Sequence, residues 1–232
     1  MRIIALDAST ELCTAALGDG TVWHERAEHA GQRHSELLLP MVRELVAEAR
    51  IALSDVGGIA FGAGPGSFTG LRIACGVAQG LAFGAGLTVV GISTLEAMAE
   101  AARVQHGATR VVAALDARMR EIYIAAYEYD GARWREVFEP VAIDPRVAPL
   151  PPGRGWAGVG AGFAAYPQLG QRLDPVLGSR DERIFPNAVA IGTLALPRFL
   201  AGEGVHARDA VPMYVRQRVA LTAAERAAGL RL

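Results

Sequence analysis

The sequence contains no lysine, so all 23 of its strongly basic residues are arginine. This absence excludes mechanisms that need a lysine amine, namely a phosphate-binding loop of the G-x-x-x-x-G-K-S/T type, a Schiff base or a lysine general base. A coding bias toward arginine is a sufficient cause. The chemical exclusion holds whatever the cause.

Cysteine is nearly absent as well. Cys13 and Cys75 each lie within an apolar segment, and no C-x-x-C spacing occurs. This usage is typical of buried, reduced cysteines in a cytoplasmic protein. The net charge of -1 supplies no basic field that would attract nucleic acid or an anionic membrane. We therefore expect any contact with RNA to be made through a partner.

Signals for export and for membrane insertion are lacking too. The apolar N-terminal run meets Asp7 too early for the core of a signal peptide. The one candidate for a membrane span, residues 71–92, contains Arg72 and Gln79 and is interrupted by glycines. These features predict a cytoplasmic protein that does not enter the membrane.

The sequence does contain enough apolar residues for a sizeable core, since 51% of its residues are hydrophobic. Apolar runs at 3–7 and 12–20, followed by weak alternation over 21–28, predict a three-stranded antiparallel meander. Apolar residues at helical spacing predict a helix over 35–50. We expect it to start within a turn of Pro40, because proline breaks a helix interior.

The following segments alternate between strand and helix. Buried strands are expected over 58–64 and 87–93, and helices over 71–83 and 95–105. Such alternation is typical of an α/β unit.

The chain then repeats its own beginning. Ala-Leu-Asp-Ala occurs at 5–8 and again at 114–117, each time at the end of an apolar run and before a polar turn and a second strand. The repeat predicts a duplicated α/β fold with two lobes, 1–105 and 106–232, each built from a mixed sheet and helices.

The second lobe has a weaker pattern, and its expected segments are strands over 133–143 and 156–162, a linker over 145–155, a helix over 186–200, a last regular segment over 212–220 and a tail over 223–232 that is either a short helix or frayed.

The stretch 62-GAGPGSFTGLR-72 combines four glycines with the start of a helix. Glycines allow the backbone to approach another group closely, and a helix N-terminus attracts anions, so the stretch has the features of a phosphate-binding loop. Its spacing fits neither the lysine-containing loop nor G-x-G-x-x-G, where Ser67 occupies the last position. A structural turn between strand and helix is the alternative interpretation.

Gly76, Gly80 and Gly84 recur every fourth residue of the next predicted helix. Each glycine inside a helix costs roughly 0.5–1 kcal/mol relative to alanine, so a stripe of three needs an offsetting gain. That gain is close approach of another backbone. It comes either from this chain's own sheet and helices or from a second polypeptide.

Asp7 and Asp116 each end an apolar strand and enter a polar turn, the position of a metal-phosphate carboxylate in duplicated ATP-binding folds. Neither is followed by a glycine that would let the backbone touch a phosphate. We therefore interpret both as remnants of a nucleotide site.

Catalytic and metal-binding groups are not apparent in the sequence. His29 and His34 are five residues apart and lack the i, i+4 spacing of a helical metal site, and no G-x-S-x-G nucleophile motif occurs. We expect no catalytic residue and no metal ligand.

Four segments together resemble the TsaB family, also called YeaZ: 4-IALDAST-10, 34-HSELLLP-40, 212-PMYVR-216 and the block 64-GPGSFTGLRIACGVAQGLAFGAGLTVVGISTLEAMA-99. The resemblance implies a two-lobed fold of the actin, hexokinase and Hsp70 type. It also implies a non-catalytic role in the synthesis of N6-threonylcarbamoyladenosine at position 37 of tRNAs that read codons beginning with A.

In such a pathway a TsaD-type transferase modifies the tRNA with the help of a TsaB-like partner and a TsaE-like ATPase. The resemblance implies a heterodimer with the transferase, recruitment of the ATPase, indirect contact with tRNA, and ATP and Mg²⁺ handled by the partners with at most weak nucleotide binding here. A homodimer is expected when the chain is alone. A nucleotide-dependent phosphotransferase of the same fold is the alternative function.

The family contact uses helices of the N-terminal lobe, which implies that the partner interface includes Leu38, Met41, Val42, Leu45, Leu71, Ile73, Gly76, Val77, Gly80 and Phe83.

Overall fold

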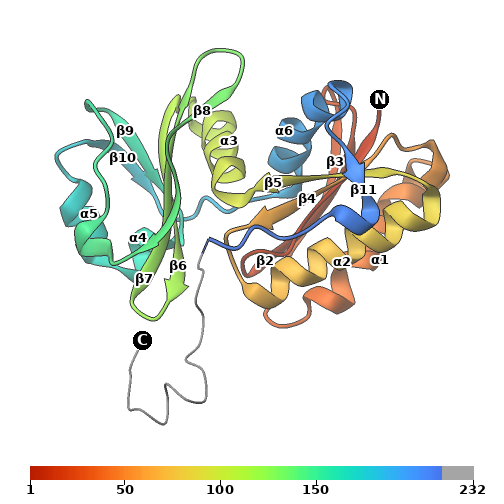
Figure 1. Cartoon of the computed structure of the whole chain (residues 1–232), viewed down its shortest axis with the longest axis horizontal. Helices are drawn as coiled ribbons and strands as arrows, with labels where there is room; N and C mark the ends of the chain where they lie inside the picture. The colour runs from red at the N-terminus through yellow and green to blue at the C-terminus, as the bar shows by residue number, and fades with distance from the viewer. Residues whose placement is uncertain (216–232) are drawn as a thin grey trace, which may run out of the picture.

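The chain folds into two β-sheets with helices between and outside them (Figure 1). The structure, a computed structural model, describes residues 1–215. The first sheet has the strand order β11-β5-β4-β1-β2-β3, with β1 (Ile3–Asp7), β2 (Leu12–Gly18), β3 (Trp23–His29), β4 (Ile59–Gly64), β5 (Thr88–Ser93) and β11 (Val205–His206). The second sheet has the order β10-β9-β6-β7-β8, with β6 (Arg110–Arg118), β7 (Glu121–Tyr129), β8 (Trp134–Ile143), β9 (Trp156–Val159) and β10 (Leu177–Asp181).

The first sheet begins with the predicted meander. Strand β2 pairs antiparallel with both β1 and β3, whereas β4 pairs parallel with β1 and with β5. Side chains of β1 alternate between the two faces, so that Ile3 and Ala5 enter one core cluster and Ile4 and Leu6 another. The prediction of three antiparallel strands is confirmed.

Helices fill three layers around the sheets. Helices α1 (His34–Glu48) and α2 (Phe68–Ala85) cover the outer face of the first sheet, and α3 (Thr94–His106) and α6 (Ala188–Leu200) lie between the sheets (Figure 1). The short helices α4 (Ala161–Ala165) and α5 (Pro167–Leu173) cover the outer face of the second sheet. Three short 3-10 helices are η1 (Leu53–Asp55), η2 (Pro145–Val147) and η3 (Ala207–Asp209). The predicted class, two mixed sheets with helices, is confirmed.

The start of α1 differs from the prediction. The helix begins at His34 and contains Pro40 in its interior, so the expectation that it starts within a turn of Pro40 is wrong. Proline removes the bond that would otherwise reach the carbonyl of Glu36. Both Glu36 and Pro40 lie on the exposed side of the helix, so this missing hydrogen bond falls on the side that faces solvent.

The end of the described chain returns to the first sheet. Strand β11 pairs antiparallel with β5, and α6 packs on β1 and β4. Residues 188–206 therefore lie on the first sheet, although the sequence divides the chain at residue 105. Of the segment expected over 212–220, residues 212–215 form no regular element, and the rest lies outside the described residues together with the 223–232 tail.

Within residues 1–215 there is no helix with the length and apolar character that crossing a bilayer requires.

Candidate functional site

The glycine-rich stretch forms the turn between β4 and α2, and its glycines touch the turn between β1 and β2. A side chain on Gly70 would overlap the carbonyl oxygen of Ala8, and a Cβ on Gly66 would lie 2.5 Å from that of Ser9. The Ser67 N–H donates to the same Ser9 oxygen at 2.7 Å. The chain itself fills the space beside the loop, which favours the structural turn over the phosphate-binding loop.

Asp7 is sealed beneath this turn. Its side chain is fully buried, and both the N–H and the hydroxyl of Ser9 donate to its Oδ2, at 3.1 and 2.9 Å. Its Oδ1 has no hydrogen-bond partner among residues 1–215 and lies against Gly62. Burial raises the pKa of Asp7 to about 7, against the two hydrogen bonds from Ser9. In this arrangement the carboxyl does not reach a ligand in solvent.

Asp116 occupies the equivalent place on β6 and anchors its own hairpin. It accepts hydrogen bonds from the Arg118 N–H at 2.8 Å and from the Tyr166 hydroxyl at 3.0 Å. The hairpin lacks glycine, yet Arg118, Met119 and Arg120 have φ angles of 62°, 54° and 63°. These residues adopt the left-handed backbone that glycine would provide in a phosphate hairpin.

The two hairpins therefore offer little catalytic chemistry. Asp7 is hydrogen-bonded within its own hairpin, and Asp116 is hydrogen-bonded to Arg118 of its hairpin and to Tyr166. Within the described chain, no group of three or more His, Cys, Asp or Glu side chains is placed to hold a metal ion.

The glycine stripe of α2 faces away from the protein. A Cβ added at Gly76, Gly80 or Gly84 would meet no atom of the described chain within 4 Å. The alanines between them, Ala78 and Ala82, are fully buried against the first sheet. The interpretation that the stripe admits this chain's own sheet or helices is therefore wrong for residues 1–215.

The residues expected at a partner interface divide into two groups. Those that are exposed or partly exposed lie on α2, and they are Ile73, Gly76, Val77, Gly80 and Phe83. Those that are buried in the core under α1 and α2 are Leu38, Met41, Val42, Leu45 and Leu71. The side chains of the second group are buried in the isolated chain and so differ from the exposed contacts that were expected, but Val42 also lines the groove between α1 and α2.

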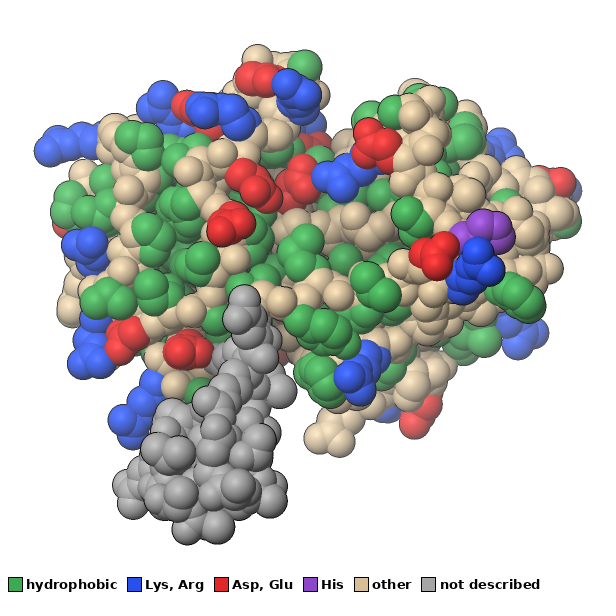
Figure 2. Space-filling view, in the orientation of Figure 1, with side chains coloured by type: hydrophobic (Ala, Val, Ile, Leu, Met, Phe, Trp, Pro, Cys, Tyr) green, Lys and Arg blue, Asp and Glu red, His purple; other side chains and the backbone are tan. Residues whose placement is uncertain are grey.

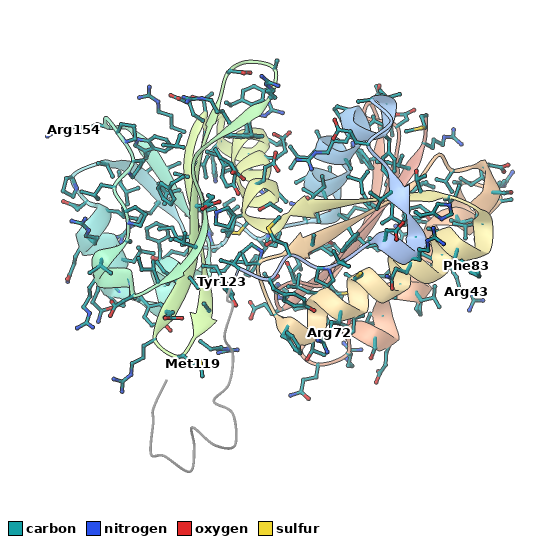
Figure 3. All side chains as sticks on the ribbon, viewed as in Figure 1. Arg43, Arg72, Phe83, Met119, Tyr123 and Arg154 are labelled. Atoms are coloured by element: carbon teal, nitrogen blue, oxygen red, sulfur yellow. The ribbon has the colours of Figure 1, made fainter. Side chains whose placement is uncertain are left out.

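Apolar surface continues beyond the predicted residues. Phe83, one of the predicted residues, is 83% exposed near the end of α2, whereas Arg72 lies near its start (Figure 3), and hydrophobic side chains gather over α2 in the space-filling view (Figure 2). Phe68 and Leu39 are also exposed. The sequence gives no sign of these two, because neither belongs to the apolar periodicity of its helix.

A groove of about 570 Å³ separates α1 from α2 next to the glycine stripe. It is lined by Pro40, Val42, Arg43, Glu44, Val46, Ala47, Leu53 and Leu81. Most of these side chains are apolar, so the groove suits a hydrophobic side chain of a binding partner better than a nucleotide.

The C-terminal segment of the described chain runs along the side of α2 that faces away from this groove. Gln79 donates to the carbonyl oxygen of Ala210 at 2.9 Å, and the Met213 N–H donates to that of Ala63 at 2.7 Å. The Arg72 Nε donates to the Tyr214 hydroxyl at 3.2 Å. Helix α2 thus contacts the sheet, α1 and this segment, and its solvent-facing side carries the glycines.

The sequence is similar to proteins of tRNA modification. The family model described as "TsaD: tRNA N6-adenosine threonylcarbamoyltransferase" matches residues 25–152. The "tRNA threonylcarbamoyladenosine biosynthesis protein TsaB" of Escherichia coli (strain K12) is 42% identical over 228 residues, which cover 95% of this chain and 96% of the relative. The protein of the same name from Haemophilus influenzae is 39% identical over 232 residues, with 94% and 95% covered.

A solved structure is similar over nearly the whole chain. YeaZ from Pseudomonas aeruginosa matches with a TM-score of 0.86 and 39% sequence identity, covering 92% of this chain and 99% of YeaZ. The match agrees with the two-lobed fold of the actin and hexokinase type that the sequence resemblance implies.

Proposed function

Because the chain belongs to the TsaB family of tRNA threonylcarbamoyladenosine biosynthesis proteins, we propose that it is the non-catalytic subunit that a TsaD-type transferase requires. In this role it binds the transferase, stabilises its active arrangement and supports recruitment of a TsaE-like ATPase. The modified nucleoside is adenosine 37 of tRNAs that read codons beginning with A. Contact with tRNA is indirect, and the complex works in the cytoplasm.

The open glycine face of α2 carries this proposal. The three glycines of α2 together cost roughly 1.5–3 kcal/mol relative to alanine, and within residues 1–215 no contact offsets that cost. A helix of another protein that packs on Gly76, Gly80 and Gly84 would approach closely enough to offset it. The adjoining groove and Phe83 supply the apolar contacts that such a helix needs.

The TsaD match supports a pairing of similar surfaces. Residues 25–152 contain both α1 and α2, so a transferase of that family has the corresponding helices. Two similar helix pairs meet most simply about a two-fold axis, as in an isologous dimer. The same argument favours a homodimer of this chain when no transferase is present.

The binding experiment uses purified chain and a well-folded TsaD-type transferase from the same source. We expect a heterodimer on size-exclusion chromatography at micromolar concentrations, and we expect tRNA modification in a reconstituted mixture to depend on this chain. Gly80→Leu should abolish the complex while the fold is retained, because a leucine separates the facing helices. Gln168→Leu on α5 adds a leucine to an exposed helix of the other lobe and serves as the control that still binds.

Failure of the wild-type chain to bind would refute the proposal. If Gly80→Leu binds as well as wild type, the partner uses another face.

The alternative, a nucleotide-dependent phosphotransferase, makes a different prediction. It requires Asp7 to reach a metal-bound phosphate, whereas the carboxyl is fully buried and hydrogen-bonded to Ser9. Calorimetry of the isolated chain with ATP and Mg²⁺ distinguishes the two functions. Stoichiometric, tight binding would favour the phosphotransferase.

A further inference from the structure

The turn between β1 and β2 touches the beginnings of both helices of the proposed partner face. The carbonyl oxygen of Ser9 accepts the N–H of Ser67, the N-cap of α2, at 2.7 Å. The carbonyl oxygen of Thr10 accepts a hydrogen bond from Nε2 of His34, the first residue of α1, at 2.8 Å. One short turn therefore joins the two helix starts.

The turn also fits against α2 without space to spare. The carbonyl oxygen of Ala8 lies where a side chain of Gly70 would be, and that of Ser9 lies 2.5 Å from where a Cβ of Gly66 would be. Any movement of the turn toward α2 must displace the first turn of that helix, because well-packed interiors transmit displacement instead of absorbing it.

Asp7 fixes the conformation of this turn. Its Oδ2 accepts two hydrogen bonds from the same residue, Ser9, one from the backbone and one from the hydroxyl. Its Oδ1 lies against Gly62 on the neighbouring strand β4 and is left unpaired within the described chain. The carboxyl is thus wedged between β4 and the turn, and its removal would free Ser9 and leave a void below it.

We propose that Asp7 is a positioning residue, which holds the β1–β2 turn so that the starts of α1 and α2 present the partner face in its binding shape. The inference rests on the proposed function and deepens it. It gives the buried carboxyl a role that needs no nucleotide. The aspartate that would hold a metal-bound phosphate in a phosphotransferase here supports a protein interface.

The test compares Asp7→Ala with Asp7→Asn in binding to the TsaD-type transferase. Asparagine keeps an oxygen that accepts the two Ser9 hydrogen bonds, whereas alanine keeps none. We expect Asp7→Ala to weaken the affinity about tenfold and Asp7→Asn to stay within about twofold of wild type, as for couplings that act through intervening residues.

A matched control separates positioning from general loss of stability. Val112→Ala removes buried side-chain volume from the outer core of the second sheet, away from both helices. It should lower the melting temperature while leaving the affinity unchanged. Ser9→Ala, which deletes one of the two hydrogen bonds, provides a milder variant if Asp7→Ala does not fold.

Hydrogen exchange gives a readout that is independent of the partner. Asp7→Ala, or Ser9→Ala in its place, should speed exchange of the Ser67 amide and of the first turns of α1 and α2 more than Val112→Ala does. Unchanged exchange there, or equal affinity losses in Val112→Ala and Asp7→Ala, would overturn the inference. If the wild-type chain does not bind the transferase, the proposed function fails, and the exchange measurement still decides whether Asp7 holds the helix starts.

Discussion

At the scale of single residues, the ionised form of Asp7 is destabilised by burial and not by a charged neighbour. A carboxyl whose pKa rises from 3.8 to about 7 on folding binds its proton more tightly in the folded state. The contribution of Asp7 to the free energy of unfolding is therefore greatest below pH 4, falls as pH rises from about 4 to about 7, and levels off above. The full difference is about 4 kcal/mol.

Asp7→Asn removes this titration while keeping the shape of the side chain. We expect urea unfolding between pH 4 and pH 8 to give a flatter profile for Asp7→Asn, with the variant more stable than wild type at pH 8. Two profiles that run parallel over this range would show that Asp7 is not the group that titrates.

In the β6–β7 hairpin, residues other than glycine adopt a strained, left-handed backbone conformation. Arg120 has a φ of 63°, and a left-handed conformation costs an ordinary residue about 1–2 kcal/mol. Arg120→Gly relieves this strain but adds freedom to the unfolded chain, so we expect a net gain in unfolding free energy of about 0.5–1 kcal/mol. Chemical denaturation measures the change.

Arg154→Gly is the control for this variant. Arg154 is also an exposed arginine in a loop, but its φ is not positive. Glycine there should leave the stability unchanged or lower it, and a gain equal to that of Arg120→Gly would argue against relief of strain.

At the scale of elements, α2 combines two sequence patterns with different purposes. Its buried alanines pack on the sheet, and its glycines face solvent. Gly80→Ala should raise the unfolding free energy of the isolated chain by up to about 1 kcal/mol, because alanine favours the helix. The same variant should weaken the complex with a TsaD-type transferase. A stability gain without any loss of affinity would show that no backbone packs at Gly80.

The elements that the sequence predicts well are those with a long, regular apolar pattern. The strand of residues 3–7 and the helices around residues 35–50 and 71–83 all appear, because one periodicity spans each of them. The pattern fails for α4, α5 and β10, which are five to seven residues long and interspersed with Gly and Pro. The presence of Pro40 led to a wrong prediction of where α1 begins, because a proline on the exposed side of a helix does not have to end it.

The candidate interface shows a different limit of sequence reasoning. The apolar stripe that identifies a helix is the stripe that packs on its own sheet, which is why Leu38 and Leu45 are buried. Surface residues such as Phe68 and Leu39 follow no such period. The glycine stripe and the α2 residues Ile73, Val77 and Phe83, which the family resemblance implied, are the predicted residues that lie at least partly exposed.

At the scale of the whole molecule, the repeated Ala-Leu-Asp-Ala motif correctly indicates two similar halves. The repeat does not reveal that α6 and β11, late in the chain, complete the first sheet. That arrangement depends on pairing across more than a hundred residues. It leaves no local periodic signal.

Because the chain passes from the first sheet to the second and then returns to the first, we expect the two halves to unfold cooperatively. Helices α3 and α6 belong to one buried cluster with residues of both sheets, such as Ile3 and Val111. Neither half can unfold without exposing the inner face of the other, so the halves should not melt separately.

Tryptophans provide a probe in each half, because Trp23 lies on β3 of the first sheet and Trp156 on β9 of the second. Replacing Trp134 and one of these two with phenylalanine leaves a single reporter in either sheet. We expect fluorescence of the two variants to give coincident urea transitions with equal slopes, once each is corrected for its own stability by circular dichroism. Separate transitions would mean that the layer between the sheets does not couple them, and that each sheet with its own helices unfolds as an independent unit.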